Sequence, residues 1–274
     1  AGAALALSVV RRRAAGESEG ALDRFLLTRG LFIAALDPLW MSWVMAPRHI
    51  LLQVLYAIGL GLVGMVALRR LPDRWLLGLA LVTIVGGEAV IGILLGGPRR
   101  APTAAFGLLM TGGRFGSLIV GYPLVPWLAM MALGWYFGGF LHRAGAARAV
   151  RLLTAAGCAA LVVFVVVRGF NGYGNMGLRR DDASLVQWLH VSKYPPSLSY
   201  TTLELGLMAL ALAALLGLGV GGGPLLVLGQ TALFYYVLHV HLLALGAWAL
   251  GVQHRAGLGA TYGAAGATVL VLYP

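Results

Sequence analysis

The chain is poor in charge and in cysteine. Of its 274 residues, 11% are charged and one, Cys158, is a cysteine, whereas 60% are hydrophobic and the mean hydropathy is +0.87. A single cysteine excludes an intrachain disulfide, and Cys158 lies in an apolar run where a packed thiol is expected. No polar block is long enough to form a separate soluble domain. The composition therefore predicts one domain over residues 1–274, an all-α helical bundle in a membrane.

Motifs of soluble enzymes are also missing. The sequence has no Gly-Lys-Ser/Thr phosphate loop, no Gly-x-Ser-x-Gly nucleophile elbow, and no histidine pair or cysteine cluster at metal-ligand spacing. We therefore predict no metal site. The net charge of +11 would suit nucleic acid. Its arginines, however, lie mostly in short loops between apolar runs, where they orient membrane helices, so no nucleic-acid partner is expected.

Long apolar runs are what the sequence does contain. Each run of about 20 residues can cross a hydrocarbon core as a helix, and the 40 glycines suit close helix contacts in lipid. We predict eight spans at 25–45, 50–68, 75–95, 122–140, 149–168, 197–218, 225–248 and 258–274. The segment 101–118 is interrupted by Gly112-Gly113-Arg114 and is predicted to be a re-entrant or interfacial helix.

Both ends of the chain look cut. Residues 1–10 form an apolar stretch too short to span, followed at once by Arg11-Arg12-Arg13, and Pro274 ends the chain without a basic anchor. We expect a fragment in which a partial N-terminal helix precedes the eight spans.

The loops alternate between two faces. One face has short basic loops and is assigned to the cytoplasm; its cations are Arg11, Arg12, Arg13, Arg24, Arg69, Arg70, Arg74, Arg143, Arg148 and Arg151. The other face carries the long segments 96–121 and 169–196. The second of these leads into Lys193-Tyr194-Pro195-Pro196-Ser197, which holds the only lysine of the chain.

Apart from Arg29 and residues at span ends, the strongly polar groups inside the predicted spans fall in the non-cytoplasmic half of the bundle. They are Asp37, Gln53, Glu88, Arg168, Glu204, His239 and His241. Buried polarity in a membrane is costly, and its placement on one side predicts a wet cavity that opens to the non-cytoplasmic face.

Each of these groups also has a structural interpretation. Asp37 precedes a proline and could satisfy freed backbone groups, and the two glutamates could form salt bridges within the bundle. His239 and His241 point about 200° apart on a helix, so at most one is expected to face the cavity. Tyr194 and Trp127 would fit an interfacial aromatic belt.

Four blocks of residues, in this order, resemble a known family. The blocks are Arg24-Phe25-Leu26-Leu27-Thr28-Arg29-Gly30-Leu31, Gly121-Tyr122-Pro123-Leu124-Val125-Pro126-Trp127, Lys193-Tyr194-Pro195-Pro196-Ser197 and Gly229-Gln230-Thr231-Ala232-Leu233-Phe234-Tyr235-Tyr236-Val237-Leu238-His239. Together they resemble the bacterial relatives of heparan-α-glucosaminide N-acetyltransferase, a family of polytopic membrane acyltransferases. The resemblance implies a bacterial inner-membrane protein that uses acetyl-CoA or another acyl-CoA as co-substrate, a sugar or glycan as acceptor and the lipid bilayer as its surroundings. A homo-oligomer is compatible with it.

The resemblance also implies roles for particular residues. The family's catalytic histidine matches no position here and is expected in a span before residue 1, so this chain would supply the other wall of the site. His239 is then a second acid–base or acceptor-orienting group, and Lys193 or Arg168 binds acidic acceptor groups or the oxyanion. Asp37 or Glu204 orients them. Further predicted substrate-binding residues are Glu88, Tyr194 and Gln53.

Two other functions remain open at this point. One is a transporter of a small polar solute, with Glu88 and Glu204 as proton-coupled carboxylates, although no internal repeat supports it. The other is a non-catalytic membrane subunit that scaffolds envelope biosynthesis.

Overall fold

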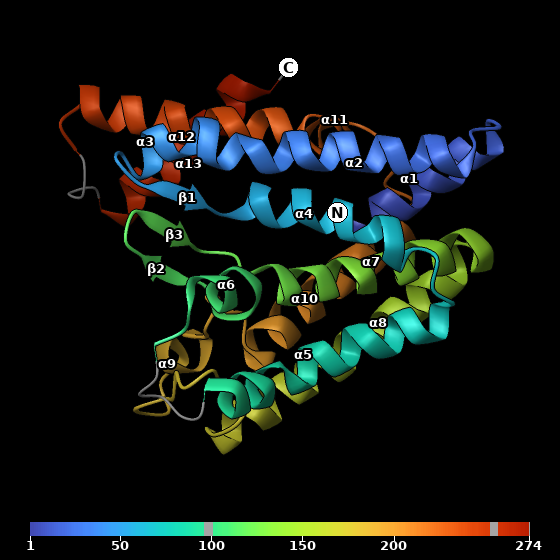
Figure 1. The fold of residues 1–274 in the computed structure, drawn as a ribbon, viewed down its shortest axis with the longest axis horizontal. Coiled ribbons are helices and arrows are strands. Elements are labelled where there is room, and N and C mark those ends of the chain that lie inside the picture. Colours follow the sequence, from blue (N-terminus) through green and yellow to red (C-terminus); the bar gives the residue numbers. More distant parts are fainter. Residues whose placement is uncertain (96–100, 253–256, 274) are drawn as a thin grey trace.

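A computed structural model describes residues 1–95, 101–252 and 257–273, and it is almost entirely helical (Figure 1). The N-terminal half contains α1 (Gly2–Ala14), α2 (Glu19–Leu36), the π-helical turn η1 (Asp37–Met41), α3 (Ser42–Met45), β1 (Ile50–Leu52), α4 (Val54–Leu68), α5 (Asp73–Leu95), α6 (Ala104–Phe106), the π-helical turn η2 (Gly107–Thr111), β2 (Gly113–Phe115) and β3 (Leu118–Val120). The remainder contains α7 (Leu124–Ala144), α8 (Ala146–Phe170), α9 (Leu185–Leu189), α10 (Leu198–Gly217), α11 (Pro224–Gln230), α12 (Ala232–Ala249) and α13 (Leu258–Leu272). The predicted all-α class is confirmed.

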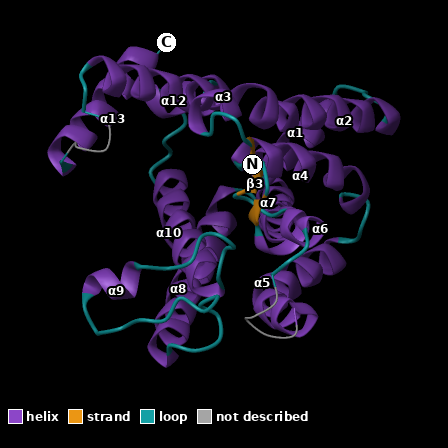
Figure 2. Cartoon of the chain, turned by 60° about the vertical axis from the view of Figure 1, so that its left-hand side comes forward, coloured by secondary structure: helices purple, strands orange, loops and turns teal. Residues whose placement is uncertain are grey.

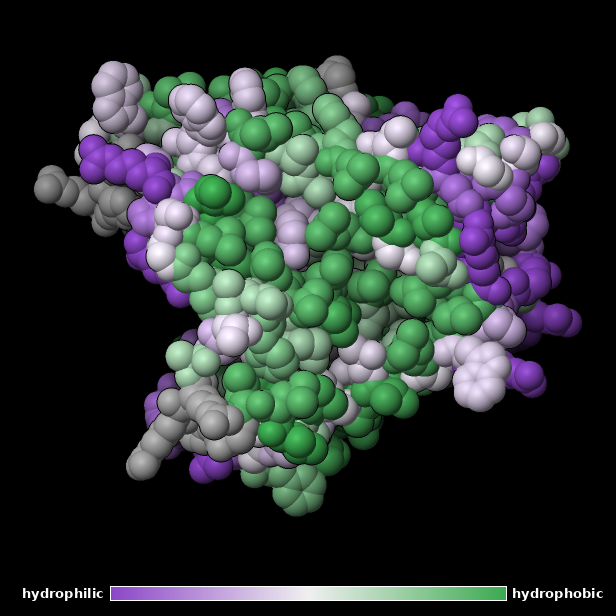
Figure 3. Space-filling model, viewed as in Figure 1, coloured by the Kyte–Doolittle hydropathy of each residue, from purple (hydrophilic) through white to green (hydrophobic). Residues whose placement is uncertain are grey.

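Helices occur at all eight predicted spans. Within the described residues, six are long and apolar enough to cross a membrane: Glu19–Met45, α5, α7, α8, α10 and α12. The helices α4 and α13 are apolar but shorter. Hydrophobic side chains cover the middle of the molecule in Figure 3 and hydrophilic ones gather at its ends, which is the pattern of an integral membrane protein.

The predicted helix over residues 101–118 occurs only at residues 104–111, and the rest of the prediction is wrong. After the single turn α6 and the π turn η2, the chain forms β2 and β3, which pair antiparallel, and β1 then pairs parallel with β3. Three glycines cause this change, because Gly112, Gly113 and Gly116 adopt φ values of +69°, +131° and +62° that a helix cannot contain. The start of the predicted second span is likewise a strand, β1, in the three-stranded order β1-β3-β2.

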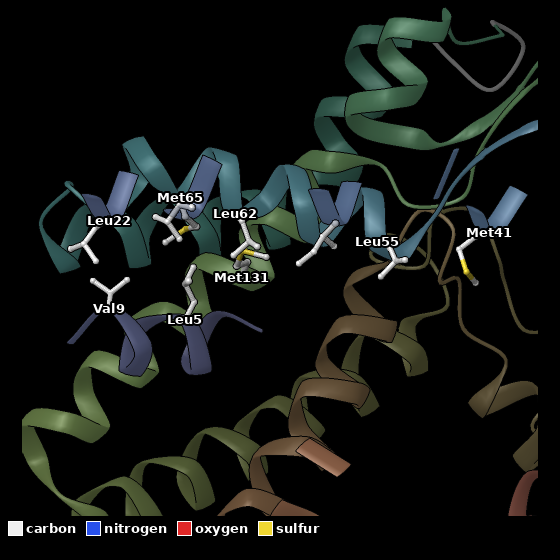
Figure 4. Close-up of a cluster of buried hydrophobic side chains, with 10 residues drawn as sticks. Leu5, Val9, Leu22, Met41, Leu55, Leu62, Met65 and Met131 are labelled. Atoms are coloured by element: carbon white, nitrogen blue, oxygen red, sulfur yellow. The ribbon is translucent and has the colours of Figure 1, made fainter. Parts of the chain in front are cut away.

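Glycine allows the closest helix contacts, as predicted. At the crossing of α2 and α4, a Cβ atom on Gly30 would lie 2.6 Å from the carbonyl oxygen of Gly59. The two backbones can therefore touch only where both side chains are absent. Figure 4 shows the adjoining core, in which Leu22, Leu62 and Met65 pack beneath this crossing.

Charged residues hold the helices together at one end of the bundle. The guanidinium of Arg69, after α4, is buried and bonds to Glu19 and Asp23 of α2, and Arg143 of α7 pairs with Asp73 of α5. The N-terminal end of α2 and the C-terminal end of α4 lie together at the right of Figure 1. The small sheet and the long loop that carries α9 lie at the opposite end (Figures 1 and 2).

Candidate functional site

Asp37 is the most deeply buried acid near the sheet end. Asp37 is 0% exposed, and its Oδ2 atom accepts hydrogen bonds from the backbone N–H groups of Gln53 at 2.6 Å and Tyr56 at 2.7 Å. The carboxylate thus joins η1 to the first turn of α4. Its other oxygen, Oδ1, is buried and has no hydrogen-bond partner in the described parts of the chain, so one acceptor position of the carboxylate is left unused by them.

Four aromatic residues form a cluster beside this acid, which we call the aromatic cluster: Tyr122, Trp127, Tyr194 and Tyr200. The rings of Tyr122 and Trp127 lie 4.6 Å apart, those of Tyr122 and Tyr194 lie 5.2 Å apart edge to face, and the Trp127 and Tyr200 centroids are 6.3 Å apart. The Tyr122 and Tyr194 hydroxyls share a hydrogen bond of 3.2 Å. The cluster brings together the β3–α7 junction, the long loop and the start of α10.

Lys193 lies over two faces of this cluster. Its ammonium nitrogen is 5.6 Å from the Tyr122 ring centroid and 5.4 Å from that of Tyr194, the range of a cation–π contact. The turn that presents it is fixed locally. Lys193 pairs with Pro196, and Ser197 caps α10 by accepting the N–H of Tyr200 at 3.0 Å.

The aromatic cluster and Asp37 are neighbours. Tyr56, whose N–H binds Asp37, packs its ring in one apolar group with Tyr122 and Trp127. Burial, then the hydrogen bond to Tyr194, raises the pKa of the Tyr122 hydroxyl, and the charge of Asp37 adds to the shift. Tyr122 therefore stays protonated at neutral pH, and Tyr236 of α12 lies within electrostatic reach of the same groups.

Arg168 and Glu88 bind the long loop. Arg168 is 0% exposed, and its guanidinium donates to Asn175 and to backbone carbonyls between residues 178 and 190. Glu88 accepts the N–H of Gly174 at 2.6 Å. Both side chains thus bind protein backbone in this structure, and the substrate-binding roles predicted for them stay predictions.

The two histidines of α12 have different neighbours, in keeping with their predicted opposite directions. The Nδ1 atom of His239 donates to the Tyr235 carbonyl at 3.0 Å, and its ring stacks on Tyr235 and lies 5.5 Å from Tyr236. His241 lies against Trp40, with ring centroids 5.6 Å apart. Because a carbonyl only accepts, Nδ1 of His239 carries a hydrogen, and Nε2 of the neutral ring is free to accept a proton.

The other two predicted substrate-binding residues make few polar contacts. Glu204 is exposed on α10, one turn after Tyr200. The side-chain nitrogen of Gln53 donates to the Met45 sulfur at 3.1 Å. Of the predicted residues, the structure thus gathers Asp37, Lys193 and Tyr194, with the backbone of Gln53.

Sequence analysis missed part of this site. Tyr122, Tyr200 and Tyr236 were not predicted to take part, and Trp127 was assigned to an aromatic belt. A signal was available, because Tyr122 and Trp127 both belong to the block at residues 121–127. Aromatic residues at span ends usually sit in the interface, so spacing alone gives no reason to prefer a packed cluster.

These features define a polytopic membrane protein with a buried acid and an aromatic cluster at one end of its helical bundle. Residues 1–169 match the family described as heparan-alpha-glucosaminide N-acetyltransferase, catalytic. The chain belongs to this family, which confirms the resemblance, and it is a membrane acetyltransferase-like protein. Comparisons with curated proteins and with solved structures found no match. The matched region includes Asp37, Gln53, Glu88 and Arg168; Lys193, Tyr194, Glu204 and His239 lie outside it.

Proposed function

We propose that the protein transfers an acetyl or other acyl group from acyl-CoA to a sugar or glycan acceptor on the non-cytoplasmic side of a bacterial inner membrane. The observation that carries this proposal is the position of Lys193, which lies over the aromatic cluster, whose members Tyr122 and Trp127 pack with the Tyr56 that binds the buried acid Asp37. Family membership supports the class of reaction.

The aromatic cluster suits a sugar acceptor. Aromatic faces pack against the apolar face of a sugar ring, and the neighbouring hydroxyls of Tyr122 and Tyr194 can bond to its polar edge. Lys193 binds acidic groups of the acceptor. The free Oδ1 of Asp37 accepts a hydrogen bond from the reacting hydroxyl or amine and so orients it.

His239 is the proposed acid–base group within this chain. Its Nε2 atom is available because Nδ1–H is bound to the Tyr235 carbonyl, and a positioned imidazole is the commonest general base. Tyr236 lies next to His239, with ring centroids 5.5 Å apart.

The donor is proposed to bind from the opposite end. Three arginines at that end, Arg69, Arg70 and Arg143, are engaged by Glu19, Asp23 and Asp73. A shallow groove of about 630 Å³ lies at the same end, lined by Arg12, Glu17, Ser18, Gly20, Ala21, Arg24, Phe25 and Thr28. Arg24 and Asp37 are separated by about 20 Å along the α2 axis, a span that the extended arm of acyl-CoA can bridge.

Replacement of the lysine tests the proposal. Full-length protein in sealed vesicles would be supplied with labelled acetyl-CoA on one side and amino-sugar acceptors on the other. We expect saturable acetyl transfer that falls at least tenfold in Lys193→Met and is partly kept in Lys193→Arg, which retains the charge. Unchanged transfer in Lys193→Met would remove this residue from the site. Solute flux without consumption of acetyl-CoA would instead favour a transporter.

A further inference from the structure

Trp127 has a buried hydrogen-bond donor that finds no acceptor among the described residues. Its indole Nε1 atom is inaccessible to solvent and has no partner among the described residues. The ring is held in place by Tyr122 and Tyr200. Nearly all buried polar groups in proteins are paired, and an unpaired one is commonly explained by a catalytic role or an ordered water.

A complementary acceptor belongs to a residue bonded to the same packed group. Asp37 Oδ1 is also buried and has no partner among the described residues, while Tyr56 both donates its N–H to Asp37 and packs with Tyr122 and Trp127. One unpaired donor and one unpaired acceptor are therefore linked through Tyr56. That arrangement suits a ligand that accepts a hydrogen bond at one atom and donates one at another, such as a thioester carbonyl beside a hydroxyl or amine.

We propose that Trp127 is a catalytic residue whose Nε1–H stabilises the oxyanion of the acyl-transfer step; this inference rests on the proposed function. The acceptor oxygen or nitrogen attacks the thioester carbon, and its proton passes to His239 Nε2. The carbonyl electron pair moves onto oxygen, where Trp127 donates to it. Collapse of the intermediate breaks the C–S bond, and the departing thiolate takes the proton from His239.

The other cations of the chain fit this task less well. Lys193 lies over ring faces rather than at an unpaired position, and Arg168 is saturated by carbonyls. Arg69 also has a buried unpaired nitrogen, Nε, but it lies among the ion pairs at the far end. An indole N–H in a dry site needs no reorganisation as charge develops, which is the requirement for an oxyanion donor.

A trapped water is the competing explanation. A cavity of about 20 Å³, lined in part by the residue before the tryptophan, has room for about one water molecule. It is lined by Pro126 and Met130 from the same helix and by Pro196 and Thr201 from the loop and α10. A water there would satisfy Nε1–H without any part in catalysis.

The test replaces only the N–H group. Benzothienylalanine at position 127 keeps the shape and stacking of tryptophan but has sulfur in place of the N–H, and Trp127→Phe provides a second, genetically simple variant. The matched control is benzothienylalanine at Trp135, which lies on the same helix and packs against the apolar core of the bundle.

We expect kcat for acetyl transfer to fall about 100-fold in the Trp127 isostere, with KM for acetyl-CoA, KM for the acceptor and the melting temperature nearly unchanged. The Trp135 isostere should keep the wild-type kcat. A wild-type kcat in the Trp127 isostere, while Lys193→Met remains impaired, would overturn this inference and leave the proposed function standing. Absence of acetyl transfer in the wild-type protein would overturn both.

Discussion

The Oδ2 atom of Asp37 lies 2.6 Å from the backbone nitrogen of Gln53 and binds its N–H, which fixes a π-helical turn of one membrane helix to the start of the next. The same oxygen accepts the N–H of Tyr56. One carboxylate oxygen thus has a structural task, while the other is buried and has no partner within the described part of the chain. Mutation of Asp37 can therefore separate the structural role of Oδ2 from the proposed catalytic role of Oδ1.

We expect Asp37→Ala to lower the free energy of unfolding by about 1–3 kcal/mol, because two buried N–H groups lose their acceptor. Asp37→Asn keeps an acceptor oxygen and should lose less stability, yet it should still lose acetyl transfer. Thermal unfolding in detergent and transfer rates in vesicles measure the two effects. Equal stability of the alanine variant and the wild type would contradict the bonding seen here.

Arg168 should behave as the positioning residue of the long loop. Arg168→Ala leaves several buried carbonyls unpaired and is expected to destabilise the protein by about 3 kcal/mol. Arg168→Lys should restore little, since an ammonium has three donors and lacks the planar geometry of a guanidinium. Limited proteolysis between residues 169 and 196 reports the loosened loop. The exposed Arg179 provides the control, and an Arg179→Ala variant should be cleaved like the wild type.

The contact between α2 and α4 should tolerate no side chain at Gly59. A Cβ atom there would overlap the Gly30 carbonyl oxygen and the Ala34 nitrogen, so Gly59→Ala is expected to cost about 1–3 kcal/mol of stability. Gly78 of α5 has no atoms within 4 Å of a built Cβ. Gly78→Ala should therefore be neutral or stabilising by less than about 1 kcal/mol. Equal melting temperatures for the two variants would argue against the tight crossing.

Replacement of Arg24 should weaken the binding of the acyl-CoA donor and leave the binding of the acceptor unchanged. If the shallow groove binds acyl-CoA phosphates, Arg24→Gln should raise KM for acetyl-CoA roughly five- to tenfold, the loss of one charge-assisted contact, and leave KM for the acceptor unchanged. Arg74→Gln removes an exposed charge from the same end of the bundle, outside the groove. It should leave both KM values unchanged. An equal effect of the two substitutions would indicate general electrostatics instead of a site.

Tyr122 should make the fold sensitive to alkali. Because burial raises the pKa of its hydroxyl in the folded state, the folded form disfavours the phenolate. Stability is then fully present below the unfolded pKa of about 10 and is lost as pH rises above it. Tyr122→Phe removes this titration and should unfold less readily than the wild type as pH rises from 9 to 11. Parallel pH profiles of the two proteins would contradict the assignment.

The spans could be predicted because hydropathy is local. Helices occur at all eight predicted spans, since an apolar run in lipid must satisfy its backbone hydrogen bonds internally. The prediction failed in the second part of the segment 101–118, where three glycines with positive φ made strands possible and β1, more than 60 positions earlier, provided the pairing partner. A partner so distant along the chain leaves no periodic signal in the segment itself.

By itself, the sequence determined that this is a helical membrane protein of the acetyltransferase family and that Asp37 and Lys193 are out of place in an apolar bundle. Only the tertiary structure decided what those groups face. It placed Arg168 against the carbonyls of its own loop, gathered the aromatic cluster from two distant segments, and left Asp37 Oδ1 and Trp127 Nε1 without a partner among the described residues. Composition and spacing record which polar groups are buried, but whether a hydrogen bond is made depends on atoms that meet only when the chain has folded.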